Sequence, residues 1–304
     1  MNTNNPSFAV QNFAPTIPGS EKVLIPNMVE VKQSFPSDRV EDVGQAVIAQ
    51  LAQFSELDLK GKSIAVTAGS RGISGMVETL KAVVVQLAEW GAKPFLVPAM
   101  GSHGGGTAEG QIAVLKNLGI TEESVGAPIH AWMDVVELGC IRDDTPVCCD
   151  RLAFESDGIV VCNRIKAHTG FAGDYESGLL KMMAIGLGKH KGTTGLHRLG
   201  FANFSEVIPE AGGMILEKAP ILFGVGLVEN AYNQVARIEG IAPEAFFDRE
   251  KELLEYAKSI MGRLLVSEMD ILVVDELGKD VSGAGMDSNV TGRSASGLKR
   301  PNAP

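Results

Sequence analysis

The chain contains 304 residues, of which 45% are hydrophobic and 21% charged, and its formal net charge is −10. This length can bury a sizeable core, either as one large domain or as two ordinary ones. With 37 acidic and 27 basic residues, the composition argues against nucleic acid or an anionic membrane surface as a partner. Glycine accounts for 35 of the 304 residues, which is more than the average frequency of about 7%, and it shows no periodic repeat. We therefore expect the glycines to serve particular loops.

Residues 1–21 are rich in Asn, Pro and Ser and are predicted to form a polar arm. No basic leader is followed by an apolar run, and no stretch approaches the roughly 20 apolar residues of a membrane span. We therefore expect a cytoplasmic protein. The cysteines lack C-x-x-C spacing, which favours reduced and mostly structural thiols; they are Cys140, Cys148, Cys149 and Cys162.

The first half of the chain predicts a βαβ unit. Residues 63–67 have the composition of a buried strand, and apolar residues at helical spacing over 73–90 predict a helix that ends at Gly91. A strand over 94–100 and a helix over 107–118 follow. Such units require a parallel sheet covered by helices, because the crossover connection returns over the sheet.

The second half predicts strands at 158–164, 221–228 and 270–274 and a long helix over 243–265. We therefore expect an α/β fold with a doubly wound, mostly parallel sheet and helices on both faces, plus the start of a smaller C-terminal lobe. The predicted division places a cofactor- and substrate-binding domain at 1–265 and the lobe at 266–304.

Three predicted strands are followed by residues that can do chemistry. Arg71 lies in TAGSRG, His103 in AMGSHGGG and His168 in NRIKAHTG. Ligands of open parallel α/β sheets bind beyond the carboxyl ends of the strands, so these side chains are expected to converge on one crevice.

Glycine and charge suggest an anionic ligand at the same place. Gly104, Gly105 and Gly173 follow the two histidines, and glycine lets backbone N–H groups approach a phosphate. A helix predicted to start near residue 177 would offer its N-terminus to that anion. Residues 164–198 contain six basic and two acidic residues, a net charge of +4, in an acidic protein.

The motifs of common nucleotide enzymes are absent. No Walker P-loop occurs, and no G-x-G-x-x-G opens a helix after a first strand, so ordinary ATP and NAD enzymes are not favoured. Four of the five histidines lie in the glycine-rich regions, where two of them could act as base and conjugate acid. Imidazole also ligates nickel, copper or zinc, although no H-E-x-x-H or H-x-H spacing occurs.

From about residue 22 to 293 the chain resembles the nickel-pincer-nucleotide-dependent lactate racemases and their 2-hydroxyacid racemase and epimerase homologues. The resemblance is carried by VTAGSRG, PAMGSHGG, RIKAHTGFAGDYESGLLKMMAIG and GLHRLG. The intervals between Arg71 and His103, between His103 and His168, and between Lys181 and His197 are also similar to those of the family.

The resemblance implies a role for each matching residue. Arg71 would bind the substrate carboxylate, with His103 and His168 as acid and base. His197 would ligate nickel, with His190 as the alternative. The remaining implied contacts are Arg293 to the substrate and Ser70, Gly104, Gly105, Gly173 and Lys181 to the cofactor, and a covalent tether at Lys181 is left open.

The implied cofactor is a pyridinium mononucleotide that holds nickel through two sulfurs and a ring carbon. The implied activity is that of an isomerase, inversion of the hydroxyl-bearing carbon of a small 2-hydroxycarboxylate by reversible hydride transfer. Cofactor-biosynthesis enzymes are then expected partners. The alternatives are a nickel-independent lyase or isomerase that uses a histidine base, and a cofactor-free metabolite-binding domain.

The chain departs from the lactate racemases that it resembles at three places. They have an acidic residue at the position of Ala68 and a shorter segment between the second histidine and the lysine. They also carry a further C-terminal lobe, and GAGMDSNVTGR resembles its beginning. We therefore expect this chain to be short for the family.

Overall fold

The computed structural model describes residues 27, 29–266, 268–278 and 285–292. The chain divides into two units, Met1–Ser34 and Phe35–Pro304. The described residues of the first unit form neither helix nor strand. The arm predicted for 1–21 lies outside the described residues, and the division predicted at residue 265 stays a prediction.

The second unit contains a five-stranded, mostly parallel sheet with the order β2-β1-β5-β6-β7. Its first four strands pair in parallel, and only β7 is antiparallel. The strands are β1 (Ser63–Ala68), β2 (Lys93–Pro98), β5 (Gly158–Arg164), β6 (Ile221–Glu229) and β7 (Val235–Ile241). The predicted α/β fold class with a mostly parallel sheet is confirmed.

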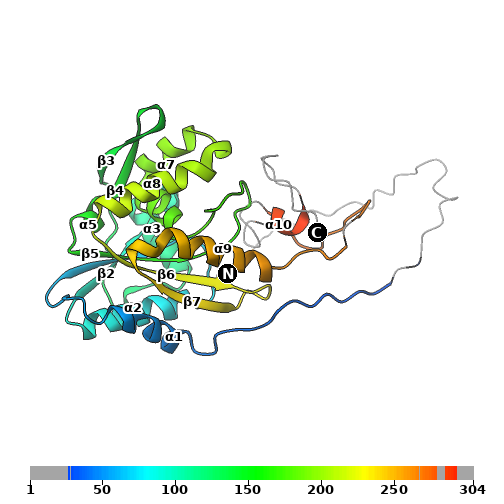
Figure 1. The fold of residues 1–304 in the computed structure, drawn as a ribbon, viewed down its shortest axis with the longest axis horizontal. Helices are drawn as coiled ribbons and strands as arrows, with labels where there is room; N and C mark the ends of the chain where they lie inside the picture. Colours follow the sequence, from blue (N-terminus) through cyan, green and yellow to red (C-terminus); the bar gives the residue numbers. More distant parts are fainter. Residues whose placement is uncertain (1–26, 28, 267, 279–284, 293–304) are drawn as a thin grey trace, which may run out of the picture. The chain divides into compact units, whose positions relative to one another are not determined.

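Helices cover both faces of this sheet. The strands alternate their side chains between two cores, so that Ile64 and Val66 of β1 pack on one side and Ala65 on the other. Helices α1 (Val43–Leu51) and α2 (Met76–Glu89) cover the first face, and α8 (Phe204–Lys218) and α9 (Phe246–Ile260) the second (Figure 1). The predicted helix over 73–90 therefore forms, although it begins three residues later.

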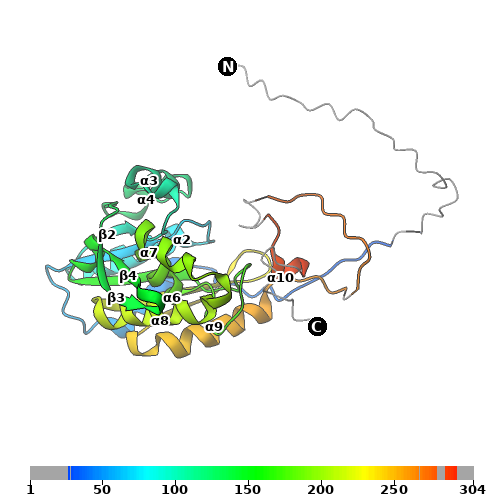
Figure 2. The ribbon, with the colours of Figure 1, turned by 90° about the horizontal axis from the view of Figure 1, so that it is seen from above.

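Shorter elements surround the ends of the strands. A hairpin of β3 (Val135–Ile141) and β4 (Thr145–Asp150) packs against α7 (Lys189–Arg198) and α8 (Figures 1 and 2). A π-helical segment, Met182–Leu187, joins α6 to α7. The other short helices are α3 (Ala108–Asn117), α4 (Glu122–Val125), α5 (Arg151–Phe154), α6 (Leu179–Lys181) and α10 (Ser288–Thr291).

Predictions about the C-terminal third were confirmed in part. The predicted helix over 243–265 forms as a 3-10 turn, Pro243–Ala245, followed by α9, which ends at Ile260, earlier than predicted. The predicted strand over 270–274 does not form, and Ile271 and Val273 are more than 80% exposed. An apolar run becomes a strand only where a neighbouring backbone pairs with it, and no described segment pairs with this run.

None of the helices in the part of the chain that the structure describes is both long enough and apolar enough to cross a bilayer.

Candidate active site

The predicted site residues follow three adjacent strands of the sheet. Ser70 and Arg71 come directly after β1, His103 after β2 and His168 after β5. The strands lie in the order β2-β1-β5 and are parallel, so their carboxyl ends open onto one edge. The structure therefore brings these loops together, as the sequence predicts.

Ser70 and His103 are in direct contact. The Ser70 hydroxyl forms a hydrogen bond with Nδ1 of His103 across the two loops. A hydroxyl can donate to or accept from a ring nitrogen, so this contact permits either tautomer of His103. Ser70, predicted to contact the cofactor, is thus placed to orient a predicted acid/base residue.

The glycines after His103 let the loop turn tightly onto helix α3. Gly104 and Gly105 have φ values of +64° and +70°, which disfavour any residue with a Cβ. A Cβ on Gly104 would lie 2.4 Å from the backbone carbon of Gly110 in α3. Gly105 has open space around it, so its backbone is accessible for the predicted cofactor contact.

His103, Arg71, Lys181 and His197 share one electrostatic environment. Burial lowers the pKa of His103, and the positive charges of Arg71 and Lys181 lower it further. Burial also lowers the pKa of Lys181 to about 8, with contributions from Arg71 and Lys166. Burial and then Lys181 lower the pKa of His197. At neutral pH both imidazoles are therefore neutral, the form that accepts a proton or ligates a metal.

The His168 loop is held by a buried carboxylate. Glu176 Oε2 accepts the backbone N–H of His168 at 2.6 Å, and Oε1 accepts that of Gly173 at 3.3 Å. Lys258 of α9 pairs with Oε1 at 2.7 Å. The N–H of Gly173 thus already donates to Glu176. A Cβ on Gly173 would lie 2.8 Å from the side chain of Ser205. The cofactor contact of Gly173 stays a prediction.

The His168 ring packs among aromatic side chains and has a defined tautomer. Its centroid lies 4.4 Å from that of Phe171 and 6.2 Å from that of Phe201. Phe201 also lies 5.8 Å from His197, so it stands between the two imidazoles. The N–H of Gly170 donates to Nδ1 of His168 at 3.0 Å, and the neutral ring therefore carries its proton on Nε2.

Helix α10 contacts the other side of the His168 loop. Ser288 donates its hydroxyl to the carbonyl of Thr169 at 2.6 Å, and the amide of Asn289 donates to the carbonyl of His168 at 3.4 Å. Asp287 pairs with Lys166 at 3.6 Å. The segment that resembles the start of a second lobe is therefore part of the wall around His168. Arg293, predicted to bind substrate, lies outside the described residues.

The expectation of an anion at the N-terminus of the helix near residue 177 was wrong. Helix α6 begins at Leu179, and the N–H groups of Leu179 and Leu180 donate to Oε2 of Glu250 at 2.7 and 2.9 Å. Glu250 comes from α9 and is buried. A protein carboxylate thus occupies the position that the sequence assigned to a ligand.

The positive charge of residues 164–198 is mostly neutralised inside the protein. Arg164 pairs with Glu229, and the fully buried Lys189 pairs with Asp150 at 2.9 Å. Lys191 pairs with Glu137 at 2.5 Å. Among the described residues no carboxylate lies within ion-pair distance of Arg71 or Lys181, so these two remain to attract an anion.

His190 and His197 both lie on α7 but have different surroundings. His197 faces the cluster through Lys181 and stacks on Phe204, with ring centroids 5.4 Å apart. His190, which is exposed as His197 is, lies against Gly106, whose added Cβ would be 3.1 Å from its Nδ1. The surroundings of His197 favour it over His190 as a ligand to a group held beside Lys181.

Sequence reasoning missed several residues that hold the two histidine loops. Glu176 offered a signal, since it is one of only two acids in a stretch with six basic residues. Glu250, Ser288 and Asn289 offered none, because they are distant in sequence from the residues they hold.

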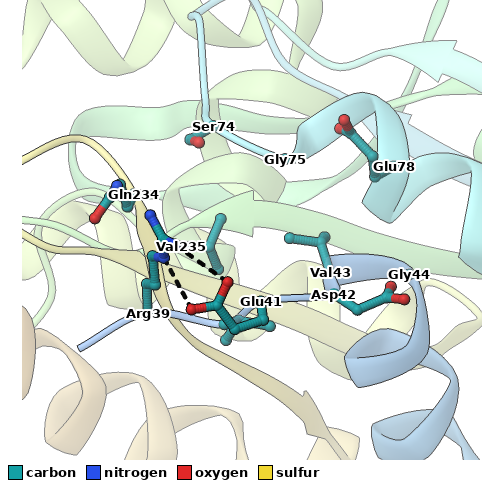
Figure 3. A pocket seen from close by; sticks show the side chains of 11 residues that line it. Arg39, Glu41, Asp42, Val43, Gly44, Ser74, Gly75, Glu78, Gln234 and Val235 are labelled. Carbon is teal, nitrogen blue, oxygen red and sulfur yellow. Dashed lines mark hydrogen bonds and ion pairs between the residues drawn. The ribbon is translucent and has the colours of Figure 1, made fainter. Parts of the chain in front are cut away.

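A cavity of about 420 Å³ lies away from these residues, where β7 begins and α2 starts. Figure 3 shows Arg39 and Glu41 paired beside it, with Glu78 and Ser74 on another side. None of the predicted site residues lines it, so we do not assign the predicted chemistry to it.

Comparisons with known proteins bear on the fold and family. The chain is similar to a crystal structure of a protein from Thermotoga maritima, with 18% identity and a TM-score of 0.56 over 72% of this chain and 61% of that one. It is also similar to the lactate racemase apoprotein of Thermoanaerobacterium thermosaccharolyticum, with 13% identity and a TM-score of 0.56 over 74% and 57% of the two chains.

The chain thus spans about three fifths of the length of both solved proteins. No curated protein matches it. The family described as the lactate racemase N-terminal domain matches residues 22–207, more than half of the chain. The matched range contains every predicted site residue except Arg293. The chain belongs to the lactate racemase N-terminal domain family.

Proposed function

We propose that this chain is the catalytic portion of a 2-hydroxycarboxylate racemase or epimerase that works with a nickel-pincer nucleotide. The observation that supports the proposal most directly is the cluster of Arg71, His103, Lys181 and His197, whose charges act on one another. Family membership supports the broader class, a lactate racemase-like isomerase.

The donor set at the site fits this cofactor. No group of three or more His, Cys, Asp or Glu side chains suited to a metal occurs within 29–266, 268–278 or 285–292. A metal bound by protein side chains alone therefore does not fit the described site. A metal held mainly by its own nucleotide needs one protein ligand, and His197 is the neutral imidazole beside Lys181. When bound, the cofactor would accept a hydride from the substrate carbon and return it to either face.

Lys181 and the loop glycines would hold the anionic parts of the cofactor. Among the described residues no carboxylate lies within ion-pair distance of the Lys181 ammonium, and the positive charge of Arg71 acts on it, an arrangement that an anion stabilises. The lowered pKa also leaves part of Lys181 as a free amine at neutral pH, as covalent attachment requires. Intact mass of the loaded protein and of Lys181→Met tests the tether.

Arg71 and the two histidines would act on the substrate. The exposed guanidinium of Arg71 can pair with the carboxylate through two parallel hydrogen bonds. His103 is neutral and can receive the hydroxyl proton, with the Ser70 hydroxyl orienting its ring. His168 would present Nε2 from the neighbouring loop.

The deciding experiment is racemisation of single 2-hydroxyacid enantiomers in deuterated water by protein co-produced with cofactor-making enzymes. We expect inversion with protium retained at the hydroxyl-bearing carbon, because hydride returns without exchanging with solvent. Deuterium at that carbon would contradict the proposal and favour a histidine base acting without nickel. Absence of both nickel and inversion would favour a cofactor-free binding domain.

A further inference from the structure

Lys189, at the start of α7, is fully buried and takes no part in the proposed chemistry. Its ammonium lies 2.9 Å from Oδ2 of Asp150, which is also fully buried. Its backbone φ is +51°, a conformation that costs free energy in a residue with a Cβ. A buried charge and a strained backbone both cost free energy of folding. We therefore expect the groups that Lys189 contacts to depend on its position.

The ammonium of Lys189 reaches two further groups near the His103 loop. It donates to the carbonyl of Pro98 at 2.6 Å, at the end of β2, and to Oε1 of Gln111 in α3 at 3.2 Å. An ammonium group only donates hydrogen bonds. Lys189 therefore fixes which end of the Gln111 amide faces it.

The other end of the buried Gln111 amide then faces the loop. Its Nε2 donates to the carbonyl of Gly101 at 2.9 Å and to that of His103 at 3.4 Å. From the opposite side, the N–H of Gly101 donates to the carbonyl of Gly186 at 3.2 Å. The backbone at Gly101 and at His103 itself is thus tied to α3, and Gly101 is also tied to the π-helical segment before α7.

We propose that Lys189 and Gln111 are positioning residues that set the orientation of His103 against Ser70, and through it the alignment of His103 for proton transfer. The catalytic part of this inference rests on the proposed function. The placement of His103 does not, because all of these contacts are between groups of the chain itself.

The first test is Gln111→Met, which keeps the side-chain size and the Lys189–Asp150 pair but removes the amide. The nitrogen NMR spectrum of the cofactor-free protein, assigned with His103→Gln, reports the hydrogen bond at Nδ1 of His103. In Gln111→Met we expect the nitrogen chemical shift of this signal to move to the value of a nitrogen without that hydrogen bond. We also expect amide hydrogen exchange of residues 100–106 to accelerate by about tenfold.

Leu115→Ala is the matched control, because Leu115 is buried on the same helix one turn further on and its side chain is apolar, so it cannot bond to the His103 loop. It weakens α3 as a whole and should leave the His103 signal unchanged. A second variant, Lys189→Met combined with Asp150→Asn, removes the relay without leaving a buried charge. It should give the same change in the His103 signal as Gln111→Met. The inference therefore stays testable if one of the two variants fails to fold.

The inference is overturned if His103 keeps its wild-type signal in Gln111→Met, or if Leu115→Ala changes that signal equally. In cofactor-loaded protein, Gln111→Met should lower kcat about tenfold with KM unchanged, because a misplaced base slows chemistry more than binding. If the spectra change as expected but wild-type protein shows no racemisation, the proposed function fails and the placement by Lys189 and Gln111 stands.

Discussion

The loops that carry His103 and His168 meet at one edge of the sheet but are held by opposite charges. The His103 loop is tied down by a buried ammonium acting through an amide, from Lys189 to Gln111. The His168 loop is tied down by the buried carboxylate of Glu176. The first loop leaves its imidazole against a hydroxyl, whereas the second gives its imidazole one tautomer.

This difference suggests unequal roles for His103 and His168, which the sequence motifs both predict to be acid/base residues. A ring whose Nδ1 can use either tautomer suits a residue that both accepts and returns a proton. A neutral ring with its proton fixed on Nε2 suits a hydrogen-bond donor to the substrate oxygen.

The largest expected effect tests this inequality with glutamine, whose amide can donate a hydrogen bond but cannot act as a base. In the loaded protein His103→Gln should lower the racemisation rate by about 10²- to 10⁴-fold, the range that a general base contributes. His168→Gln keeps a hydrogen-bond donor and should lose no more than about tenfold, through the weaker geometry of that hydrogen bond. Equal losses in both variants would remove the distinction, and full activity in either would remove that residue from the reaction.

A pH effect on stability should come from the buried carboxyl group that caps α6. Burial raises the pKa of Glu250, which caps the helix leading to Lys181, to about 7. A carboxyl whose pKa is raised by folding binds more protons in the folded state between its two pKa values. The free energy of unfolding should therefore fall as pH rises from about 4.5 to 7, by about 3 kcal/mol from this group.

Chemical denaturation of Glu250→Gln across pH 5 to 8 measures that contribution, because the variant cannot titrate there. Its pH dependence should be flatter than that of the wild type. Glu255→Gln, an exposed change on the same helix, should follow the wild-type profile. Identical profiles for the wild type and Glu250→Gln would show that Glu250 does not titrate in this range.

Removal of the carboxylate that holds the His168 loop should have an intermediate effect. Glu176→Leu leaves the N–H groups of His168 and Gly173 without their carboxylate acceptor and should destabilise the protein by about 1–3 kcal/mol. Asp174→Ala, which removes an exposed ion pair with Lys251, should cost under about 1 kcal/mol in the same denaturation series. A smaller cost for Glu176→Leu than for Asp174→Ala would contradict the anchoring role.

The smallest expected effect concerns α10. Ser288→Ala removes the hydrogen bond to Thr169 and should cost about 0.5–1.5 kcal/mol, with faster amide exchange confined to residues 166–171. Thr291→Ala, whose hydroxyl bonds only to the carbonyl of Asp287, should not change exchange in that loop. Unchanged exchange in Ser288→Ala would mean that α10 does not support the His168 loop.

The sheet and the site loops could be predicted because local patterns encode them. The strand over 158–164 was predicted to the residue, since a buried parallel strand is a continuous apolar run between turn signals. The position of Arg71, His103 and His168 followed from a general rule for parallel sheets. The family resemblance rested on the same loops and is confirmed over residues 22–207.

What could not be predicted depends on contacts between distant residues. The helix end near residue 177 is capped by Glu250, about seventy positions away, and no local pattern distinguishes such a cap from a site for an external anion. The positive stretch looked available because the acids that neutralise it, Asp150 and Glu229, lie outside it in sequence. The run over 270–274 has strand composition, but pairing is a property of its surroundings.

That unpaired run has a consequence for handling the protein. Ile271, Leu272, Val273 and Val274 form an exposed window of high β-propensity without proline, the kind of segment through which separate molecules associate edge to edge. Asp270 and Asp275 stand at its two ends, where their charges oppose stacking of identical copies. Removal of these two charges, as in Asp270→Asn combined with Asp275→Asn, should therefore favour aggregation.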